Sequence, residues 1–207
     1  AAVRQGPPLD AIIANAGIMA LPKLEQRHGV ELQLFTNHVG HFLLVTGLLD
    51  HLSETARIVL LSSAAHGMAP KMGIDFDNLD GSKGYSAWPA YGQSKLANIL
   101  FTNELARRFA GTRWTANAVH PGVISTNLSR HMPGITGIGF ALVGPFVLKS
   151  IPEGAATEVW AATHPSLEGV SGEYFADCNV STRSANARNP DLARRLWETT
   201  EAIAARL

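Results

Sequence analysis

The fold follows from the stretch Leu9-Asp10-Ala11-Ile12-Ile13-Ala14-Asn15-Ala16-Gly17, in which a short apolar run meets a small polar turn. The first six residues are mostly apolar and include β-branched side chains, which is typical of a buried strand. Apolar positions then recur at helical spacing from about residue 31 to residue 52. The order strand, turn, helix is the repeating unit of an α/β sheet.

The same unit recurs along the chain. Residues 57–61 are predicted to form a second buried strand that ends in Ser62-Ser63, and residues 114–119 a third strand that ends in His120-Pro121-Gly122. We also expect helices over residues 89–109, 152–163 and 191–206 and a short strand near residues 174–175. We therefore predict one Rossmann-like domain over residues 1–207, α/β in class, with a doubly wound parallel sheet. The carboxyl ends of parallel strands share one edge, so the three turns should surround one crevice.

Composition excludes several classes of protein. The chain has 207 residues, 46% hydrophobic and 16% charged, with zero formal net charge, and it shows no basic patch suited to nucleic acid. A single cysteine, Cys178, excludes an internal disulfide and favours a reducing compartment, so we expect a cytoplasmic location. Residues 1–10 do not resemble a signal peptide, and the apolar stretch 135–148 is shorter than the roughly 20 residues of a transmembrane helix. The histidines show no convincing metal-ligand spacing, His38 and His41 being the nearest to one, so we predict no metal site.

Tyr91 and Lys95 lie four residues apart in a predicted helix, which places both side chains on one face. An ammonium group near a phenol favours the phenolate and should lower the pKa of Tyr91. A phenol tuned in this way can exchange protons with an alcohol or a carbonyl. The spacing alone is more typical of a solvated surface pair, and the neighbouring motifs are what favour the catalytic interpretation.

Several motifs in a fixed order resemble the short-chain dehydrogenase/reductase family. They are Asn15-Ala16-Gly17, Asn37, Ser62-Ser63, Tyr91-x-x-x-Lys95 and Pro121-Gly122-x-x-x-Thr126. The stretches at residues 37–44, 91–98 and 172–178 are similar to the retinol-dehydrogenase-like branch of that family. The resemblance extends over essentially the whole chain.

The resemblance implies a catalytic tetrad of Asn37, Ser63, Tyr91 and Lys95. Tyr91 would be the general acid/base, and Lys95 would lower its pKa and bind the nicotinamide ribose. Ser63 would hold the substrate oxygen, with Ser62 as the second choice, and Asn37 would anchor a water that relays protons to Lys95. Serines after a strand also serve simply as turn formers or caps, and an asparagine in a helix can bond to backbone alone.

The resemblance also implies NADP or NAD as cofactor. Besides Tyr91 and Lys95, the residues expected to contact it are Asn15, Ala16 and Gly17 on the adenosine side and Pro121, Gly122, Ile124 and Thr126 beside the nicotinamide. The family usually has an asparagine where this chain has Ala14. A tight turn alone would also explain the Pro-Gly pair.

A dinucleotide-binding sheet normally begins with a strand, a Gly-rich turn and a helix that receives the pyrophosphate. Residues 1–8 contain no such turn. Relative to the family, we expect on the order of 70 residues to be absent. The sheet would then be N-terminally incomplete, the strand at residues 9–14 would be an exposed apolar edge, and cofactor affinity and activity would be impaired. The alternative is that the sequence is a fragment of a longer enzyme.

The resemblance implies a substrate-binding lid at residues 127–150, and these residues are largely apolar. This predicts an apolar alcohol or carbonyl substrate, such as a retinoid, a steroid or a long-chain aldehyde, although the same residues could cover the core or a subunit interface. The helices at residues 31–52 and 89–109 suggest, with the resemblance, a homo-oligomer. We expect an oxidoreductase that transfers hydride with NAD(P). The alternative is a non-catalytic binding or scaffolding relative.

Overall fold

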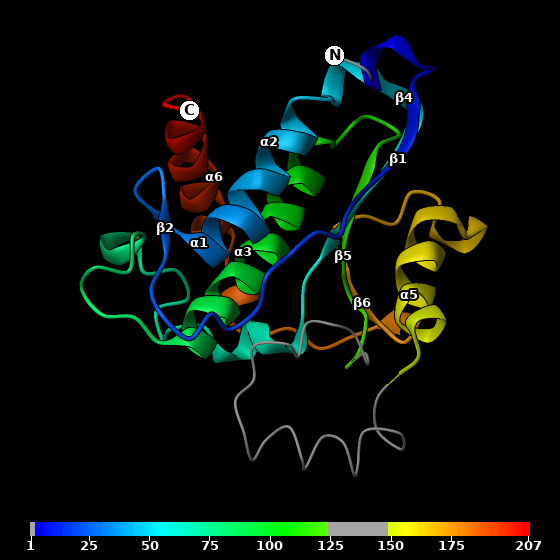
Figure 1. Cartoon of the computed structure of the whole chain (residues 1–207). Coiled ribbons are helices and arrows are strands. Elements are labelled where there is room, and N and C mark those ends of the chain that lie inside the picture. The colour runs from blue at the N-terminus through cyan, green and yellow to red at the C-terminus, as the bar shows by residue number, and fades with distance from the viewer. Residues whose placement is uncertain (1–2, 124–148) are drawn as a thin grey trace.

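A single five-stranded sheet organises the protein (Figure 1). The computed structural model describes residues 3–123 and 149–207. The strands lie in the order β1-β4-β5-β6-β7, and all neighbours are parallel except the last pair, β6 and β7. Their bounds are β1 Leu9–Ala14, β4 Leu52–Leu61, β5 Thr115–His120, β6 Tyr174–Ala176 and β7 Asn179–Val180.

Helices cover both faces of the sheet, as predicted for an α/β fold (Figure 1). One face carries α1 (Leu32–Leu34), α2 (Gly40–Thr46), α3 (Ala87–Arg108) and α6 (Pro190–Ala204), and the opposite face carries α5 (Ile151–Thr163). A π-helical segment, Phe35–Val39, joins α1 to α2. The remaining short elements are the 3-10 turns Val3–Gln5, Leu49–His51, Ala64–Met68, Phe76–Asn78, Pro165–Leu167 and Asn186–Arg188, and the hairpin β2 (Gln26–Arg27) and β3 (Val30–Glu31).

The side chains of β4 alternate between two separate cores. Ile58 and Leu60 are fully buried against the helices of the α3 face, where Trp197 of α6 joins them. Val59 points to the other face and packs with Ala161 of α5 and Phe175 of β6. A strand buried on both faces needs a continuous apolar run, which explains why residues 58–61 do not alternate with polar side chains.

The helix expected over residues 31–52 is shorter and less regular in the structure. α2 ends at Thr46, and Leu52 already belongs to β4, where it pairs with Leu9 of β1. Gly47 follows α2, and a Cβ atom there would lie 2.7 Å from the Leu43 carbonyl oxygen. Three features were not predicted: the early start of β4, the strand β7 and the β2–β3 hairpin. The other strands and helices lie within a few residues of their predicted bounds.

β1 occupies one edge of the sheet, and in the described ranges it pairs only with β4. Ile13 on this strand is 42% exposed, which agrees with the expectation of an apolar edge. Within the same ranges, no helix is long and apolar enough to cross a membrane.

Candidate active site

The turns after β1, β4 and β5 meet at the same edge of the sheet. Ala14 aligns with Leu60, and Leu60 aligns with Ala118, so the three strands end side by side. A hydrogen bond of 3.4 Å from the Ala64 N–H to His120 Nδ1 joins the turn after β4 to the end of β5. The three turns that the motif order predicted to lie together are therefore neighbours at one edge of the sheet.

Gly92 brings α3 against the turn that follows β4. A Cβ atom at this position would lie 2.6 Å from the Ala65 carbonyl oxygen and 2.7 Å from the Ala69 nitrogen. Only a residue without a side chain allows this approach of helix to backbone. The approach places Tyr91, one residue before the glycine, beside Ser63.

Tyr91 and Lys95 lie on one face of α3, with the Lys95 Nζ atom 5.7 Å from the centre of the phenol ring. Burial raises the pKa of Tyr91, and the Ser63 hydroxyl, its hydrogen-bonding neighbour, opposes that rise. This direction is opposite to the one expected from the sequence. The reason is that Tyr91 is almost fully buried, with an exposed fraction of 7%, and the Lys95 ammonium group donates instead to the Leu61 carbonyl at 3.2 Å.

Lys95 is itself strongly affected by its surroundings. Burial lowers the pKa of Lys95 to about 8, while the carboxylate of Glu158 on α5 raises it. Among the described residues, one of the three N–H donors of this ammonium group has a partner, which is the Leu61 carbonyl oxygen. The group can therefore hold further oxygen acceptors at the sheet edge.

The two serines after β4 have different environments. Ser62 is buried, and its hydroxyl donates a 2.8 Å hydrogen bond to the Lys95 carbonyl, which ties α3 to the sheet. Ser63 is partly exposed and faces Tyr91, and its hydroxyl also accepts the Ala65 N–H at 3.1 Å. Ser63 is thus the serine that lies at the candidate site, and it serves as a cap as well.

Asn37 lies in the π-helical segment, a type of irregularity that is frequent at functional sites. Its Nδ2 donates to the Ile18 carbonyl at 2.9 Å and to the Ser94 hydroxyl at 2.9 Å, and its Oδ1 accepts the Ile18 N–H at 2.8 Å. Both amide donors are therefore used within the protein. Only the second lone pair of Oδ1 remains for another partner.

Gly17 lies between the side chains of Asn37 and Lys95. A Cβ atom at Gly17 would lie 3.1 Å from Asn37 Oδ1 and 3.5 Å from Lys95 Nζ. The missing side chain leaves room next to an ammonium group that, among residues 3–123 and 149–207, makes one hydrogen bond. This arrangement fits a ribose hydroxyl of a nicotinamide cofactor, and Asn15 and Ala16, both exposed, continue the same edge.

Pro121 and Gly122 follow β5 at this edge. Gly122 has φ +88°, a conformation that favours glycine, and a Cβ atom there would lie 2.7 Å from the Lys149 side chain. Lys149 in turn forms an ion pair with Asp177. Ile124, Thr126 and most of the predicted lid at residues 127–150 lie outside the described residues.

Two buried polar residues, Asn98 and His41, lie next to Lys95 and were not singled out from the sequence. Asn98 is fully buried, and its Nδ2 donates to the Leu61 carbonyl at 2.9 Å, the same oxygen that Lys95 contacts. His41 Nδ1 lies 3.4 Å from that amide nitrogen. Burial, together with the charge of Lys95, lowers the pKa of His41 to about 4. Both residues stand within motifs already quoted, at residues 37–44 and 91–98, but only the fold brings them together.

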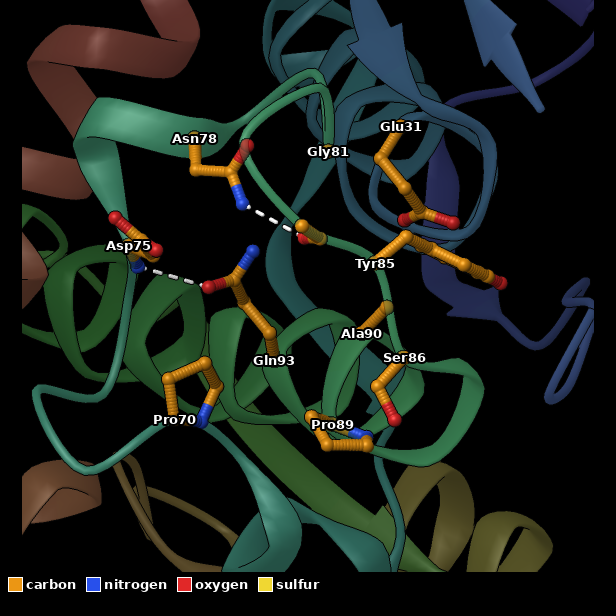
Figure 2. Close-up of a pocket in the computed structure, with 11 residues that line it drawn as sticks. Glu31, Pro70, Asp75, Asn78, Gly81, Tyr85, Ser86, Pro89, Ala90 and Gln93 are labelled. Atoms are coloured by element: carbon orange, nitrogen blue, oxygen red, sulfur yellow. Dashed lines mark hydrogen bonds between the residues drawn. The ribbon is translucent and has the colours of Figure 1, made fainter. Parts of the chain in front are cut away.

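A separate cavity of about 320 Å³ lies under the loop that precedes α3 (Figure 2). Its lining includes Gln93 but none of Ser63, Tyr91 and Lys95. Gln93 Oε1 accepts the Asp75 N–H at 2.8 Å, and Asn78 Nδ2 donates to the Gly84 carbonyl at 2.9 Å. These bonds fasten the loop to α3 and to itself, and the cavity is distinct from the candidate active site.

Comparison with known proteins agrees with this arrangement. Residues 1–163 match a family model described as enoyl-(acyl carrier protein) reductase. The chain is 46% identical over 203 residues to short-chain dehydrogenase TIC 32 B, chloroplastic, of Brassica napus, covering 92% of this chain and 62% of the relative. It is 42% identical over 205 residues to retinol dehydrogenase 14 of Homo sapiens, covering 97% of this chain and 60% of the relative. It thus spans about three fifths of the length of these curated relatives.

Solved structures share the fold. A crystal structure of an uncharacterised protein from Mycobacterium paratuberculosis superposes with a TM-score of 0.75 at 33% identity, covering 98% of this chain and 71% of that chain. A blue fluorescent protein from a metagenomic library, in complex with NADPH, superposes with a TM-score of 0.58 at 22% identity. The match covers 82% of this chain and 63% of that chain. The family match, the dehydrogenase relatives and the shared fold agree with the motifs at the sheet edge, and this chain belongs to the short-chain dehydrogenase/reductase family, with retinol dehydrogenases among its relatives.

Proposed function

We propose that the protein is an oxidoreductase that interconverts an apolar alcohol and its carbonyl compound by hydride transfer with NAD(P). The observation that supports this most strongly is the grouping of Ser63, Tyr91 and Lys95 at one edge of the sheet, next to the gap at Gly17. A hydroxyl, a phenol and an ammonium group around one point are suited to stabilising and protonating a carbonyl oxygen.

In the direction of reduction, the substrate oxygen would lie between the Ser63 hydroxyl and the Tyr91 phenol. The nicotinamide, when bound, supplies the hydride to the carbonyl carbon. Tyr91 gives its proton to the oxygen, so the carbonyl becomes an alcohol and the phenol becomes a phenolate. Oxidation runs the same steps in reverse.

Lys95 would serve this chemistry in two ways. The N–H donors that Leu61 does not use would hold the ribose of the cofactor, and the positive charge would stabilise the phenolate that forms on Tyr91. A pKa of about 8 leaves the ammonium form predominant at neutral pH and still able to give up a proton in weakly basic solution. Asn37 would contribute through its remaining Oδ1 lone pair, which faces the gap toward Lys95 and could accept a relaying water.

The choice of an apolar substrate rests on the relatives named retinol dehydrogenase and on the apolar composition of residues 127–150. The choice of a nicotinamide cofactor rests on the family, and NADPH is the form bound by one structural neighbour. The experiment is to mix the protein with NADPH or NADH and a long-chain aldehyde and to follow loss of the reduced nicotinamide absorbance. We expect aldehyde-dependent loss with at least one cofactor, at a rate reduced by weak cofactor binding because residues 1–8 contain no Gly-rich turn, and no loss with either would oppose the proposal.

We also propose that the protein self-associates. Leu43 and Leu44 on α2 are 38% and 44% exposed, whereas most of α3 is already buried within the chain. An apolar helix face of this kind is suited to pairing with a second copy. Sedimentation of the wild-type protein and of Leu44→Glu would test this, because the variant should be monomeric.

A further inference from the structure

Trp88 is an exposed aromatic residue beside the candidate general acid. It lies in the first turn of α3, three residues before Tyr91, and 40% of its surface is exposed. The indole and phenol rings meet edge to face, with 6.2 Å between their centres and 79° between their planes. The indole therefore stands next to a phenol that is itself almost completely buried.

The other three tryptophans have evident structural roles. Trp197 packs in the core against Phe42 and Phe101, and Trp160 meets Phe175 edge to face. Trp114 donates its N–H to the Ser53 carbonyl at 2.7 Å. Trp88 has no hydrogen bond within the described ranges, and its only aromatic neighbour there is Tyr91.

A second exposed apolar side chain stands near the same turn of α3. Met68 is 55% exposed and belongs to the 3-10 turn that follows Ser63. Its backbone carbonyl carbon would lie 2.8 Å from a Cβ atom on Gly92, so this turn is packed directly against the residue after Tyr91. Large exposed apolar side chains that gather at one place on a protein usually mark a surface that binds something apolar.

We propose that Trp88 is a specificity-determining residue whose indole ring contacts the apolar part of the substrate while Tyr91 holds its oxygen. This rests on the proposed function and names the side chain that selects large apolar alcohols and carbonyls over small ones. A substrate oxygen bonded to the Tyr91 hydroxyl would carry its substituents close to the phenol ring, which the partly exposed indole of Trp88 adjoins. Desolvation of an alkyl chain against the indole favours long substrates and does nothing for short ones.

The test compares decanal with propanal in wild-type protein, Trp88→Ala and Trp88→Phe. We expect the alanine variant to raise KM for decanal by roughly ten-fold, the size of effect that a lost apolar contact has on specificity. KM for propanal should stay within about two-fold of the wild-type value, and phenylalanine should restore most of the preference for decanal. Equal changes for both aldehydes, or no change for either, would overturn the proposal.

A binding measurement separates this proposal from the proposed function. When decanol covers the exposed indole in the presence of oxidised cofactor, the tryptophan emission should shift to shorter wavelength in wild-type protein and in Tyr91→Phe. The shift should be absent in Trp88→Phe. If Tyr91→Phe were as active as wild type, the proposed function would fail. If Tyr91→Phe were inactive but the emission shift persisted in Trp88→Phe, only the role of Trp88 would fail.

Discussion

Gly92 and Ala65 are in direct backbone contact, and this contact determines whether Tyr91 can reach Ser63. A Cβ atom on Gly92 would lie 2.6 Å from the Ala65 carbonyl oxygen, a distance that no real side chain tolerates. The helix that carries the phenol and the turn that carries the hydroxyl are thus placed by the absence of one side chain.

Gly92→Ala should push the Ala64–Met68 turn away from α3. We expect a loss of about 1–3 kcal/mol in the free energy of unfolding, as for other overpacked sites, and a larger proportional loss of activity because Ser63 moves from Tyr91. Gly67→Ala in the same turn is the matched control, because a Cβ atom there meets nothing within 4 Å. Urea unfolding and steady-state kinetics on both variants would check this, and equal behaviour of the two would contradict it.

Ser62→Ala and Ser63→Ala should have opposite consequences. Removing the Ser62 hydroxyl leaves the Lys95 carbonyl without that buried partner and should cost about 1 kcal/mol of stability, with little change in the chemical step. Removing the Ser63 hydroxyl should leave stability nearly unchanged and lower kcat by about 10²–10³, as loss of an oxyanion donor does. The assignment of Ser63 would be abandoned if Ser62→Ala proved the more damaging to kcat.

Lys95 should make stability rise with pH in weakly basic solution. Its pKa is lowered from 10.5 to about 8 in the folded protein, so between these values the unfolded chain binds more protons. Stability should therefore increase from about pH 8 toward pH 10, by up to about 1.4 kcal/mol per pH unit. Lys95→Met should remove this slope. Denaturant midpoints between pH 8 and pH 9.5 would measure it, and parallel slopes for the two proteins would show that the ammonium group is not buried.

His38 and His41 should make the protein sensitive to acid. Burial lowers the pKa of His38 to about 3, and burial with the charge of Lys95 lowers the pKa of His41 to about 4. Both pKa values in the folded protein lie below the value of 6.5 in the unfolded chain. The free energy of unfolding should therefore keep its full value above about pH 6.5 and fall as the pH drops toward about 4. Between pH 6 and pH 5, the free energy of unfolding should change with pH less steeply in His38→Leu than in the wild-type protein, by about 1.4 kcal/mol per pH unit. An unchanged slope would mean that His38 accepts a proton in the folded state.

Much of the fold could be predicted because its signals are local. The run at residues 58–61 is apolar throughout because β4 is covered on both faces. The start of the last helix follows the local signal Asn-Pro-Asp at residues 189–191, and in the structure the Asn189 side chain accepts the Asp191 and Leu192 N–H groups. The π-helical segment and the early start of β4 could not be predicted, since they depend on contacts with Ile18 and Leu9 that are distant in the sequence.

The same limit applies to the candidate site. Tyr91 and Lys95 could be paired from helical spacing alone, but the direction of the Tyr91 pKa could not, because it depends on burial by other elements. The roles of Ser62 and Ser63 separate only when the side chains are seen to point to Lys95 and Tyr91, respectively. His41 and Asn98 were not singled out because their common partner, the Leu61 carbonyl, belongs to a third segment of the chain.

The most direct test of the account is the rate of aldehyde reduction by Tyr91→Phe, which removes one oxygen and keeps the ring. If Tyr91 donates the proton, kcat/KM should fall by about 10²–10⁴ while the melting temperature stays near that of the wild-type protein. A variant that reduces the aldehyde at the wild-type rate would contradict the assignment of Tyr91 and, with it, the proposed chemistry of this site.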